Sequence, residues 1–257
     1  MNVSGIAVIV GGASGIGAAC SRYFASKGAD VVIADRNLEA ASVLANEIRA
    51  RAYEVDVTSE AVIRECVARI ERDVGPVHSL INCAGLIQGP TRPLEMSMLR
   101  WDEVTNVDQR GTFMTCIAFG AAMVNRGRGS IVNVASVAGM RSLPLHAYAP
   151  AKAAVISMTE CLAAEWGPAG VRVNCVSPGF TRTLTLQNAI DLKGFNTDSM
   201  TSGAALGRLV EPTEIAKAVA FLCSDDAAAI SGVNLPVDCG WLAGSAWSAY
   251  GGLRAPK

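Results

Sequence analysis

The chain has 257 residues, of which 51% are hydrophobic and 18% are charged. Globular proteins carry about 25% charged residues, so this composition excludes a disordered chain and predicts that some surface is buried against other copies of the chain. The 22 basic residues nearly cancel the 23 acidic ones without forming a basic stripe, which argues against nucleic acid and anionic membranes as partners.

Seven short apolar segments alternate along the chain with segments of helical periodicity. The apolar segments are nearly continuous in hydrophobicity, as in strands covered on both faces. They are Ile6–Val10, Val31–Ala34, Ala52–Val55, Val77–Asn82, Ser130–Val134, Val171–Val176 and Val233–Val237. Helical spacing is found in Leu38–Ala50, Ala61–Val74, Trp101–Met123, Ala149–Trp166 and Pro212–Cys223. The alternation predicts an α/β fold with one Rossmann-like, doubly wound, parallel seven-stranded sheet.

The first strand leads directly into a glycine-rich segment, Gly11-Gly12-Ala13-Ser14-Gly15-Ile16-Gly17, and then into a helix. Glycines allow a sharp turn and a close approach to a pyrophosphate, which binds the free N–H groups at a helix start. A tight turn alone is the alternative reading of such a cluster. Its position between strand and helix favours the nucleotide site, so we expect residues 1–257 to form one NAD(P)-binding domain.

Asp35 ends the second predicted strand, about 20 residues after the glycines, where a carboxylate accepts hydrogen bonds from the ribose hydroxyls of NAD. The alternative is that Asp35 caps the following helix. Arg36 complicates the choice, because an arginine here suits the phosphate of NADP. We expect NAD, since the carboxylate repels a 2′-phosphate.

Tyr148 and Lys152 are four residues apart and therefore share one face of a helix. An ammonium group beside a phenol favours the phenolate and lowers the pKa of the tyrosine, which permits proton exchange with an alcohol or ketone. Taken alone, a Tyr and a Lys at this spacing favour a surface contact between an aromatic ring and a lysine.

The motifs occur in a fixed order that resembles the short-chain dehydrogenase/reductase family over essentially the whole chain. The residues that carry the resemblance are Gly11-x-x-x-Gly15-Ile16-Gly17, Asn82-Cys83-Ala84-Gly85, Asn106, Asn133-Val134-Ala135-Ser136, Tyr148-x-x-x-Lys152 and Pro178-Gly179-Phe180-Thr181-Arg182-Thr183. Each lies at or beside a predicted strand end, or on a flanking helix.

This resemblance implies a role for each candidate catalytic residue. Tyr148 is the implied general acid/base, and Lys152 lowers its pKa and binds the nicotinamide ribose. Ser136 polarises the substrate oxygen, and Asn106 holds a water of the proton relay. Ordinary alternatives are a backbone hydrogen bond for Ser136, helix-interior packing for Asn106 and a strand-end cap for Asp56. The expected cofactor-binding set is Gly11, Ser14, Gly15, Ile16, Gly17, Asp35, Arg36, Asp56, Val57, Asn82, Ala84, Gly85, Tyr148, Lys152, Pro178, Gly179, Thr181 and Thr183.

Val10 and Ala135 depart from the family pattern, and His146 is a further residue of interest. Val10 replaces the usual Thr before the first glycine and removes a hydroxyl that ties the loop down. Ala135 precedes Ser136 where a second Ser is common, which makes the choice of serine clearer. His146 lies two residues before Tyr148, and either a structural bond or a substrate contact fits it.

One irregular insertion, residues 180–207, follows the sixth strand and is predicted to be a substrate lid, with a plain surface loop as the alternative. Its polar residues favour a small hydroxylated substrate such as a polyol or sugar; they are Thr181, Thr183, Thr185, Gln187, Asn188, Asn196, Thr197, Asp198 and Ser199. Apolar neighbours such as Leu184, Ile190 and Phe195 argue against this reading if they face inward.

The expected activity is an NAD-dependent interconversion of a secondary alcohol and a ketone. The alternatives are a 3-oxoacyl thioester reductase and a catalytically idle, NAD-responsive binding protein. We expect no metal, because the eight cysteines stand singly and only two histidines occur. We expect a cytoplasmic protein for three reasons. The cysteines are expected to be buried free thiols, the N-terminus lacks the charged start of a secretory signal, and no apolar run is long enough to span a membrane.

The helix Trp101–Met123 carries more apolar surface than one sheet face requires. We therefore expect a homotetramer, with this helix and Ala149–Trp166 at one interface and residues 233–250 at another. Trp241, Trp247 and Tyr250 concentrate aromatic surface in that second region.

Overall fold

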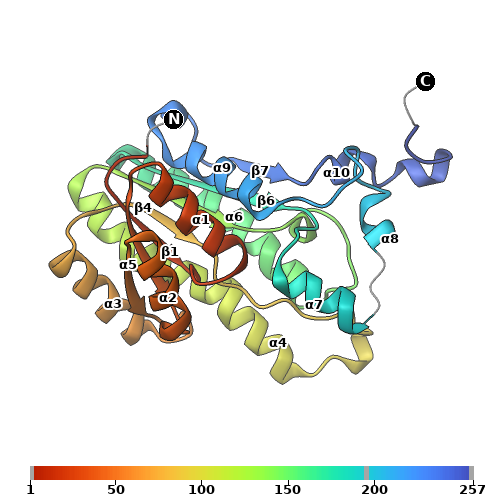
Figure 1. The fold of residues 1–257 in the computed structure, drawn as a ribbon, viewed down its shortest axis with the longest axis horizontal. Helices are drawn as coiled ribbons and strands as arrows, with labels where there is room; N and C mark the ends of the chain where they lie inside the picture. Colours follow the sequence, from red (N-terminus) through yellow and green to blue (C-terminus); the bar gives the residue numbers. More distant parts are fainter. Residues whose placement is uncertain (1–2, 194–196, 255–257) are drawn as a thin grey trace.

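The structure is a computed structural model that describes residues 3–193 and 197–254. Its centre is a seven-stranded sheet with the order β3-β2-β1-β4-β5-β6-β7, in which all pairs are parallel, and helices cover both faces (Figure 1). The strands are β1 Ile6–Val10, β2 Asp30–Asp35, β3 Arg51–Glu54, β4 Val77–Asn82, β5 Gly129–Val134, β6 Val171–Pro178 and β7 Asn234–Val237. The predicted doubly wound sheet is confirmed.

The helices are α1 Gly15–Ser26, α2 Leu38–Ile48, α3 Glu60–Asp73, α4 Met98–Thr105, α5 Thr112–Arg126, α6 Tyr148–Trp166, α7 Leu184–Lys193, α8 Thr197–Thr201, α9 Pro212–Cys223 and α10 Trp241–Gly244. Four of the helices, α2, α3, α6 and α9, were predicted from apolar spacing and lie within a few residues of their expected bounds. The expected helix Trp101–Met123 corresponds to α4 and α5 joined by a π-helical turn, Asn106–Gly111. Short 3-10 helices are Pro93–Glu95, Val137–Gly139, Gly167–Ala169, Asp225–Ala227 and Trp247–Tyr250.

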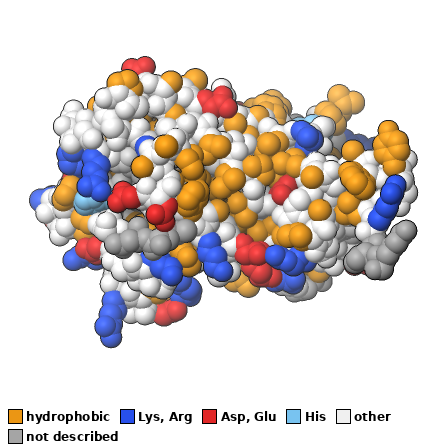
Figure 2. All heavy atoms as spheres, turned by 90° about the horizontal axis from the view of Figure 1, so that it is seen from above, with side chains coloured by type: hydrophobic (Ala, Val, Ile, Leu, Met, Phe, Trp, Pro, Cys, Tyr) orange, Lys and Arg blue, Asp and Glu red, His pale blue; other side chains and the backbone are white. Residues whose placement is uncertain are grey.

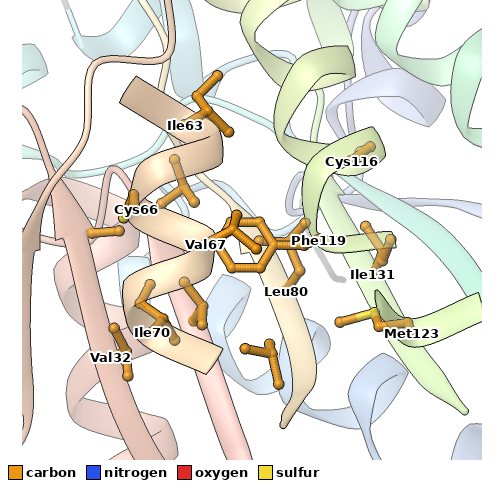
Figure 3. Close-up of a cluster of buried hydrophobic side chains, with 14 of the residues drawn as sticks. Val32, Ile63, Cys66, Val67, Ile70, Leu80, Cys116, Phe119, Met123 and Ile131 are labelled. Carbon is orange, nitrogen blue, oxygen red and sulfur yellow. The ribbon is translucent and has the colours of Figure 1, made fainter. Parts of the chain in front are cut away.

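Two apolar cores lie on opposite faces of the sheet. On one face Phe119 of α5 points toward α3, where Val67 lies, with Leu80 of β4 beside it (Figure 3). On the other face Phe24 of α1 and Ile215 of α9 pack in one cluster with the central strands. Because both faces of the strands are buried, the sheet is rigid and its carboxyl edge can hold reactive groups in place.

The segment predicted as an irregular lid contains two helices, α7 and α8. The Thr183 hydroxyl accepts a hydrogen bond of 3.2 Å from the N–H of Leu186 and so caps the start of α7. The expectation of an irregular segment is therefore wrong. One of the polar residues that suggested a loop, Thr183, is instead the cap of a helix. Asn196 and Phe195 lie outside the described residues, and the side chains of Thr185 and Ser199 are not described either.

Within residues 3–193 and 197–254, no helix is long and apolar enough to cross a membrane, and no group of three or more His, Cys, Asp or Glu could hold a metal ion. The eight cysteines are all free. The expected burial is found for Cys20, Cys66, Cys116 and Cys175 and is wrong for Cys161, which is exposed on α6.

The C-terminal region projects from the body of the molecule (Figure 1). Trp241 is not part of an exposed aromatic cluster, because its ring packs edge-on against Phe180 of the same chain at 5.6 Å between ring centres. Trp247 and Tyr250 remain exposed. Figure 2 looks down on the side where α9, β7 and α10 lie in Figure 1 and shows hydrophobic side chains gathered in a broad band between charged groups.

Candidate active site

The glycine-rich turn after β1 leaves the start of α1 open to an anion. Gly11 has φ +73°, and a Cβ there would lie 2.5 Å from the backbone nitrogen of Ala84. Ser14 is the N-cap of α1 without a side-chain cap bond, and the first turn of α1 has no acidic residue. The N–H groups of the first turn of α1 are therefore available to a pyrophosphate, with the positive end of the helix dipole behind them.

The glycine-rich turn is held in place by other hydrogen bonds, although Val10 supplies no hydroxyl. The N–H of Ala13 donates to Asp35 Oδ2 at 3.0 Å, and Ser21 Oγ donates to the carbonyls of Gly12 and Gly17 at 3.1 and 3.0 Å. These bonds explain how the loop keeps its shape although position 10 is apolar.

Asp35 does not cap the following helix. Its Oδ1 accepts from the N–H of Asn37 at 2.9 Å, and Asn37 is the residue that caps α2, through a 3.0 Å bond from Ala40. Each oxygen of a carboxylate has a second lone pair, so Asp35 is held by two backbone bonds and can still accept from a ribose. Arg36 is exposed beside it.

Asp56 forms a turn at the end of the third strand. Its Oδ1 accepts from the N–H of Thr58 at 2.9 Å and from the hydroxyl of Thr58 at 2.7 Å. These two bonds, opposed by partial burial and assisted by Arg36, hold the pKa of Asp56 below its usual value. The strand-end cap is thus the observed bonding of Asp56, while Val57 is buried against Gly111.

The side chain of Asn82 forms hydrogen bonds inside the core and not in the cofactor cleft. Its Nδ2 donates to Asn133 Oδ1 at 2.9 Å, and its Oδ1 accepts from Thr115 at 2.9 Å. Asn133 in turn donates to the hydroxyl of Thr159 at 3.0 Å. This buried network joins β4, β5, α5 and α6 and fixes the strand ends that carry the reactive residues.

Tyr148, Lys152 and Ser136 are brought together at the carboxyl end of β5. The ammonium of Lys152 lies 5.5 Å from the centre of the Tyr148 ring and donates to the carbonyl of Val134 at 3.0 Å. Ser136 Oγ accepts from the N–H of Ala138 at 3.1 Å, so the backbone bond considered for it exists and leaves its O–H as a donor.

Burial has the largest effect on the pKa of Tyr148 and raises it above the usual value. Lys152 and the hydrogen bond with Ser136 lower this pKa, whereas Asp108 raises it further. The predicted effect of Lys152 therefore has the expected direction but is outweighed. Burial lowers the pKa of Lys152, yet Asp108 and Tyr148 together hold it above its ordinary value.

Asp108, and not Asn106, is the residue of the interrupted helix that reaches this group. Asn106 is exposed. Asp108 is 0% exposed, its Oδ2 lies 3.2 Å from the ammonium of Lys152, and its Oδ1 accepts from the N–H of Leu86 at 2.7 Å. The placement of Asn106 at the site is therefore wrong, because the π-helical turn directs position 108 inward.

Gln88 is a further residue that the sequence reading missed. It follows the turn Asn82–Gly85, is 2% exposed, and its Oε1 accepts from the N–H groups of Ala147 and Tyr148 at 2.7 and 3.2 Å. A polar residue in the segment after a central strand was the available signal, since such segments border ligands in this fold class.

The segment after β6 reaches the glycine-rich turn. A Cβ on Gly15, whose φ is +52°, would lie 3.7 Å from Thr183 Cγ2, so Thr183 lies close to the turn. Thr181 is buried, and its hydroxyl donates to the carbonyl of Gly179 at 2.8 Å. Of the expected cofactor residues here, Pro178 ends β6, Gly179 follows it, and Thr183 lies beside the glycine-rich turn.

His146 lines a different hollow. A groove of about 370 Å³ is bounded by the 138–146 segment and by Ala149, Pro150 and Ala153 on α6. Ser136, Tyr148 and Lys152 are not among the described residues that line it. A substrate contact by His146 therefore has no support from this groove.

Comparison with known proteins identifies the family. A family model described as Enoyl-(Acyl carrier protein) reductase matches residues 11–242. D-threitol dehydrogenase of Mycolicibacterium smegmatis is 37% identical over 243 residues, which are 92% of both chains. The chain belongs to the short-chain dehydrogenase/reductase family. It is accordingly an oxidoreductase that binds a nicotinamide cofactor.

Two further relatives of this short-chain dehydrogenase/reductase have full-length similarity. The NAD-dependent glycerol dehydrogenase of Listeria innocua is 37% identical over 242 residues, 92% of this chain and 93% of that protein. A solved structure described as ribose-5-phosphate isomerase from Brucella melitensis 16M is 50% identical, covers 98% of both chains and has a TM-score of 0.96.

Proposed function

We propose that the protein is an NAD-dependent dehydrogenase that interconverts a secondary alcohol and a ketone on a small polyol or diol. The observation that carries this proposal is the Tyr148 phenol beside the Lys152 ammonium and Ser136, at the sheet edge that also bears the glycine-rich turn. A protein that only sensed NAD would have no use for a partly buried phenol beside a buried ammonium.

The chain's own residues fit a proton-transfer role. The nicotinamide supplies the hydride chemistry when it is bound. Ser136 donates its O–H to the substrate oxygen, which holds the reacting carbon in place and polarises the bond. In alcohol oxidation the phenolate oxygen of Tyr148 accepts the hydroxyl proton, and in ketone reduction the phenol returns it. Lys152 stabilises the phenolate, because its ammonium is fixed by Val134 and Asp108.

Asp35 supports NAD over NADP. Its carboxylate is held at the end of β2 by Ala13 and Asn37, where it presents acceptors to two ribose hydroxyls and repels a 2′-phosphate. The glycerol dehydrogenase relative is NAD-dependent, which agrees with this choice. Arg36 is exposed, and its charge contributes to the lowered pKa of Asp56 after the two hydrogen bonds from Thr58.

The substrate class is argued from the segment after β6 and from relatives. Thr183, Gln187 and Asn188 of that segment are hydrophilic, and the two dehydrogenase relatives act on threitol and glycerol. Initial rates at the absorbance of reduced nicotinamide test this with NAD and NADP across polyols, diols, monohydric alcohols and 3-hydroxyacyl thioesters. We expect the best rates with NAD and a polyol or diol. If thioesters were the best substrates, the protein would be a thioester reductase instead. If it converted ribose 5-phosphate without net NAD reduction, it would be an isomerase.

We also propose a homotetramer that works in the cytoplasm, where free cysteines such as the eight here are kept reduced. Met98, Leu99 and Phe113 are exposed on α4 and α5, and β7 is a sheet-edge strand with exposed Val233 just before it. Exposed apolar helices and an open sheet edge are both surfaces that a second copy would cover.

A further inference from the structure

The start of α6 is capped by a side chain from a distant part of the chain. Ala147, the residue that precedes α6, provides no side-chain cap, and the N–H groups of Ala147 and Tyr148 donate instead to Gln88 Oε1 at 2.7 and 3.2 Å. The first N–H groups of a helix have no partner inside the helix and need such an acceptor. Turning the amide over would aim its NH₂ group at two N–H donors, so the oxygen of Gln88 faces α6.

The segment that carries Gln88 is tied to Lys152 as well as to Tyr148. The N–H of Leu86 donates to Asp108 Oδ1 at 2.7 Å, and Asp108 Oδ2 lies 3.2 Å from the ammonium of Lys152. Residues 86–88 therefore reach Lys152 through Asp108 and hold the backbone of Tyr148 directly through Gln88. The phenol and the ammonium are both anchored to this one segment after β4.

The amide of Gln88 also carries a cost in stability. Its Nε2 is buried and has no hydrogen-bond partner among the described residues, and a buried donor that stays unpaired is destabilising. A cap made by a Ser, Thr or Asp side chain would supply the acceptor with no such NH₂ group. The useful part of Gln88 is therefore its oxygen, and the residue of the reactive group that this oxygen holds is Tyr148.

We propose that Gln88 is a positioning residue, which fixes the backbone of Tyr148 so that the phenol oxygen stays aligned with Lys152 and with the substrate hydroxyl. This rests on the proposed dehydrogenase function. Gln88 acts through Tyr148 and does not touch the reacting atoms. A reacting group that is displaced by about 1 Å can lose about 10²-fold in rate. Loss of the Gln88 oxygen therefore slows the chemical step and leaves the binding of NAD and substrate nearly unchanged.

Gln88→Met and Gln88→Glu separate the oxygen of the side chain from its volume. Met has a similar length without the carbonyl, whereas Glu keeps an oxygen for Ala147 and Tyr148. The substrate used is whichever of glycerol, threitol and butane-2,3-diol the wild-type protein oxidises fastest with saturating NAD. Each variant is measured at the pH of its highest rate, so that the charge of Glu acting on the pKa of Tyr148 does not enter the comparison.

We expect kcat to fall about 10- to 100-fold in Gln88→Met, with KM and the NAD affinity measured by fluorescence changed less than about threefold. Gln88→Glu should restore kcat to within about threefold of the wild-type value. Ser59→Ala is the matched control, because Ser59 caps α3 by accepting from the N–H of Val62 at 3.4 Å. This variant also loses a helix cap, and it should lower the melting temperature while kcat stays within about twofold.

Two results would overturn the inference while the proposed function holds. In the first, Gln88→Met loses thermal stability but keeps kcat within about twofold, so that Gln88 only caps the helix. In the second, Gln88→Glu binds NAD normally but loses about tenfold or more in kcat, so that the oxygen is not what matters. If the wild-type protein oxidises none of the three alcohols, the proposed function fails and this inference fails with it.

Discussion

Replacing Asp108 by Asn removes a buried negative charge from the reactive group and keeps the side-chain shape. The amide oxygen of Asn can still accept from the N–H of Leu86, which Asp108 Oδ1 holds at 2.7 Å. The charge that opposes ionisation of Tyr148 disappears, while Lys152 and Ser136 continue to favour the phenolate. The pKa of Tyr148 is therefore expected to fall in Asp108→Asn.

The size of the shift follows from the geometry. Asp108 Oδ2 lies 3.2 Å from the ammonium of Lys152, which lies 5.5 Å from the Tyr148 ring centre. At a separation of about 10 Å and an effective dielectric constant of about 20, two unit charges interact by about 1.7 kcal/mol, which is about one pKa unit. If Asp108→Asn only disturbed the local structure, kcat would change without such a shift in the pKa of Tyr148.

The assay is the pH dependence of kcat/KM for alcohol oxidation with saturating NAD. Oxidation needs the phenolate, so the rate rises as the pH passes through the pKa of Tyr148. Asp108→Asn is expected to move this rise about one unit toward acid, and ketone reduction should lose activity at correspondingly lower pH. Asp102→Asn makes the same change on an exposed part of α4 and should leave the profile in place. An unmoved or alkaline-shifted profile in Asp108→Asn would show that Asp108 does not act on Tyr148 through its charge.

Three further predictions concern the cofactor, the core and the assembly. Asp35→Asn keeps an acceptor for Ala13 but loses the charge, and it should narrow the preference for NAD over NADP at least about tenfold, or 1.4 kcal/mol; a wild-type preference for NADP in the same kinetics would contradict this. Phe119→Ala removes a buried ring and should lower the free energy of unfolding by about 3–5 kcal/mol in urea titration, whereas the exposed Phe113→Ala should cost far less. Sedimentation at micromolar concentration should give a tetramer, and a monomer would overturn the proposed interfaces.

The sheet could be predicted because the local sequence of each strand shows its apolar pattern. Continuous apolar runs such as Ile6–Val10 and Val31–Ala34 require burial on both faces, and parallel pairing with helices on both sides provides it. The glycine-rich turn could be placed for the same reason, since it directly follows the first strand.

The position of Asp108 could not be read from residue type. Asn106 has the side chain that the family resemblance calls for, yet it is exposed, and the π-helical turn brings Asp108 to Lys152. A weaker signal was present: Val104, Asp108, Thr115 and Phe119 form the buried stripe of α4, the π-helical turn and α5. A charged residue on such a stripe requires a partner.

The contacts of Gln88 were equally beyond sequence reasoning. They depend on the three-dimensional meeting of the segment after β4 with the start of α6, about 60 residues later in the chain. The same holds for the pKa of Tyr148, because the spacing of Tyr148 and Lys152 predicts their attraction but not the burial that outweighs it.

The central claim is that Tyr148 carries the proton in an NAD-dependent oxidation, and Tyr148→Phe tests it most directly. Phe keeps the ring beside Lys152 and removes only the ionisable oxygen. Initial rates with NAD and the best polyol or diol should fall by about 10²–10⁴ in kcat, while NAD affinity measured by fluorescence titration changes little. A Phe variant that retains more than about a third of the wild-type kcat would contradict the account, because general acid–base catalysis contributes far more than that.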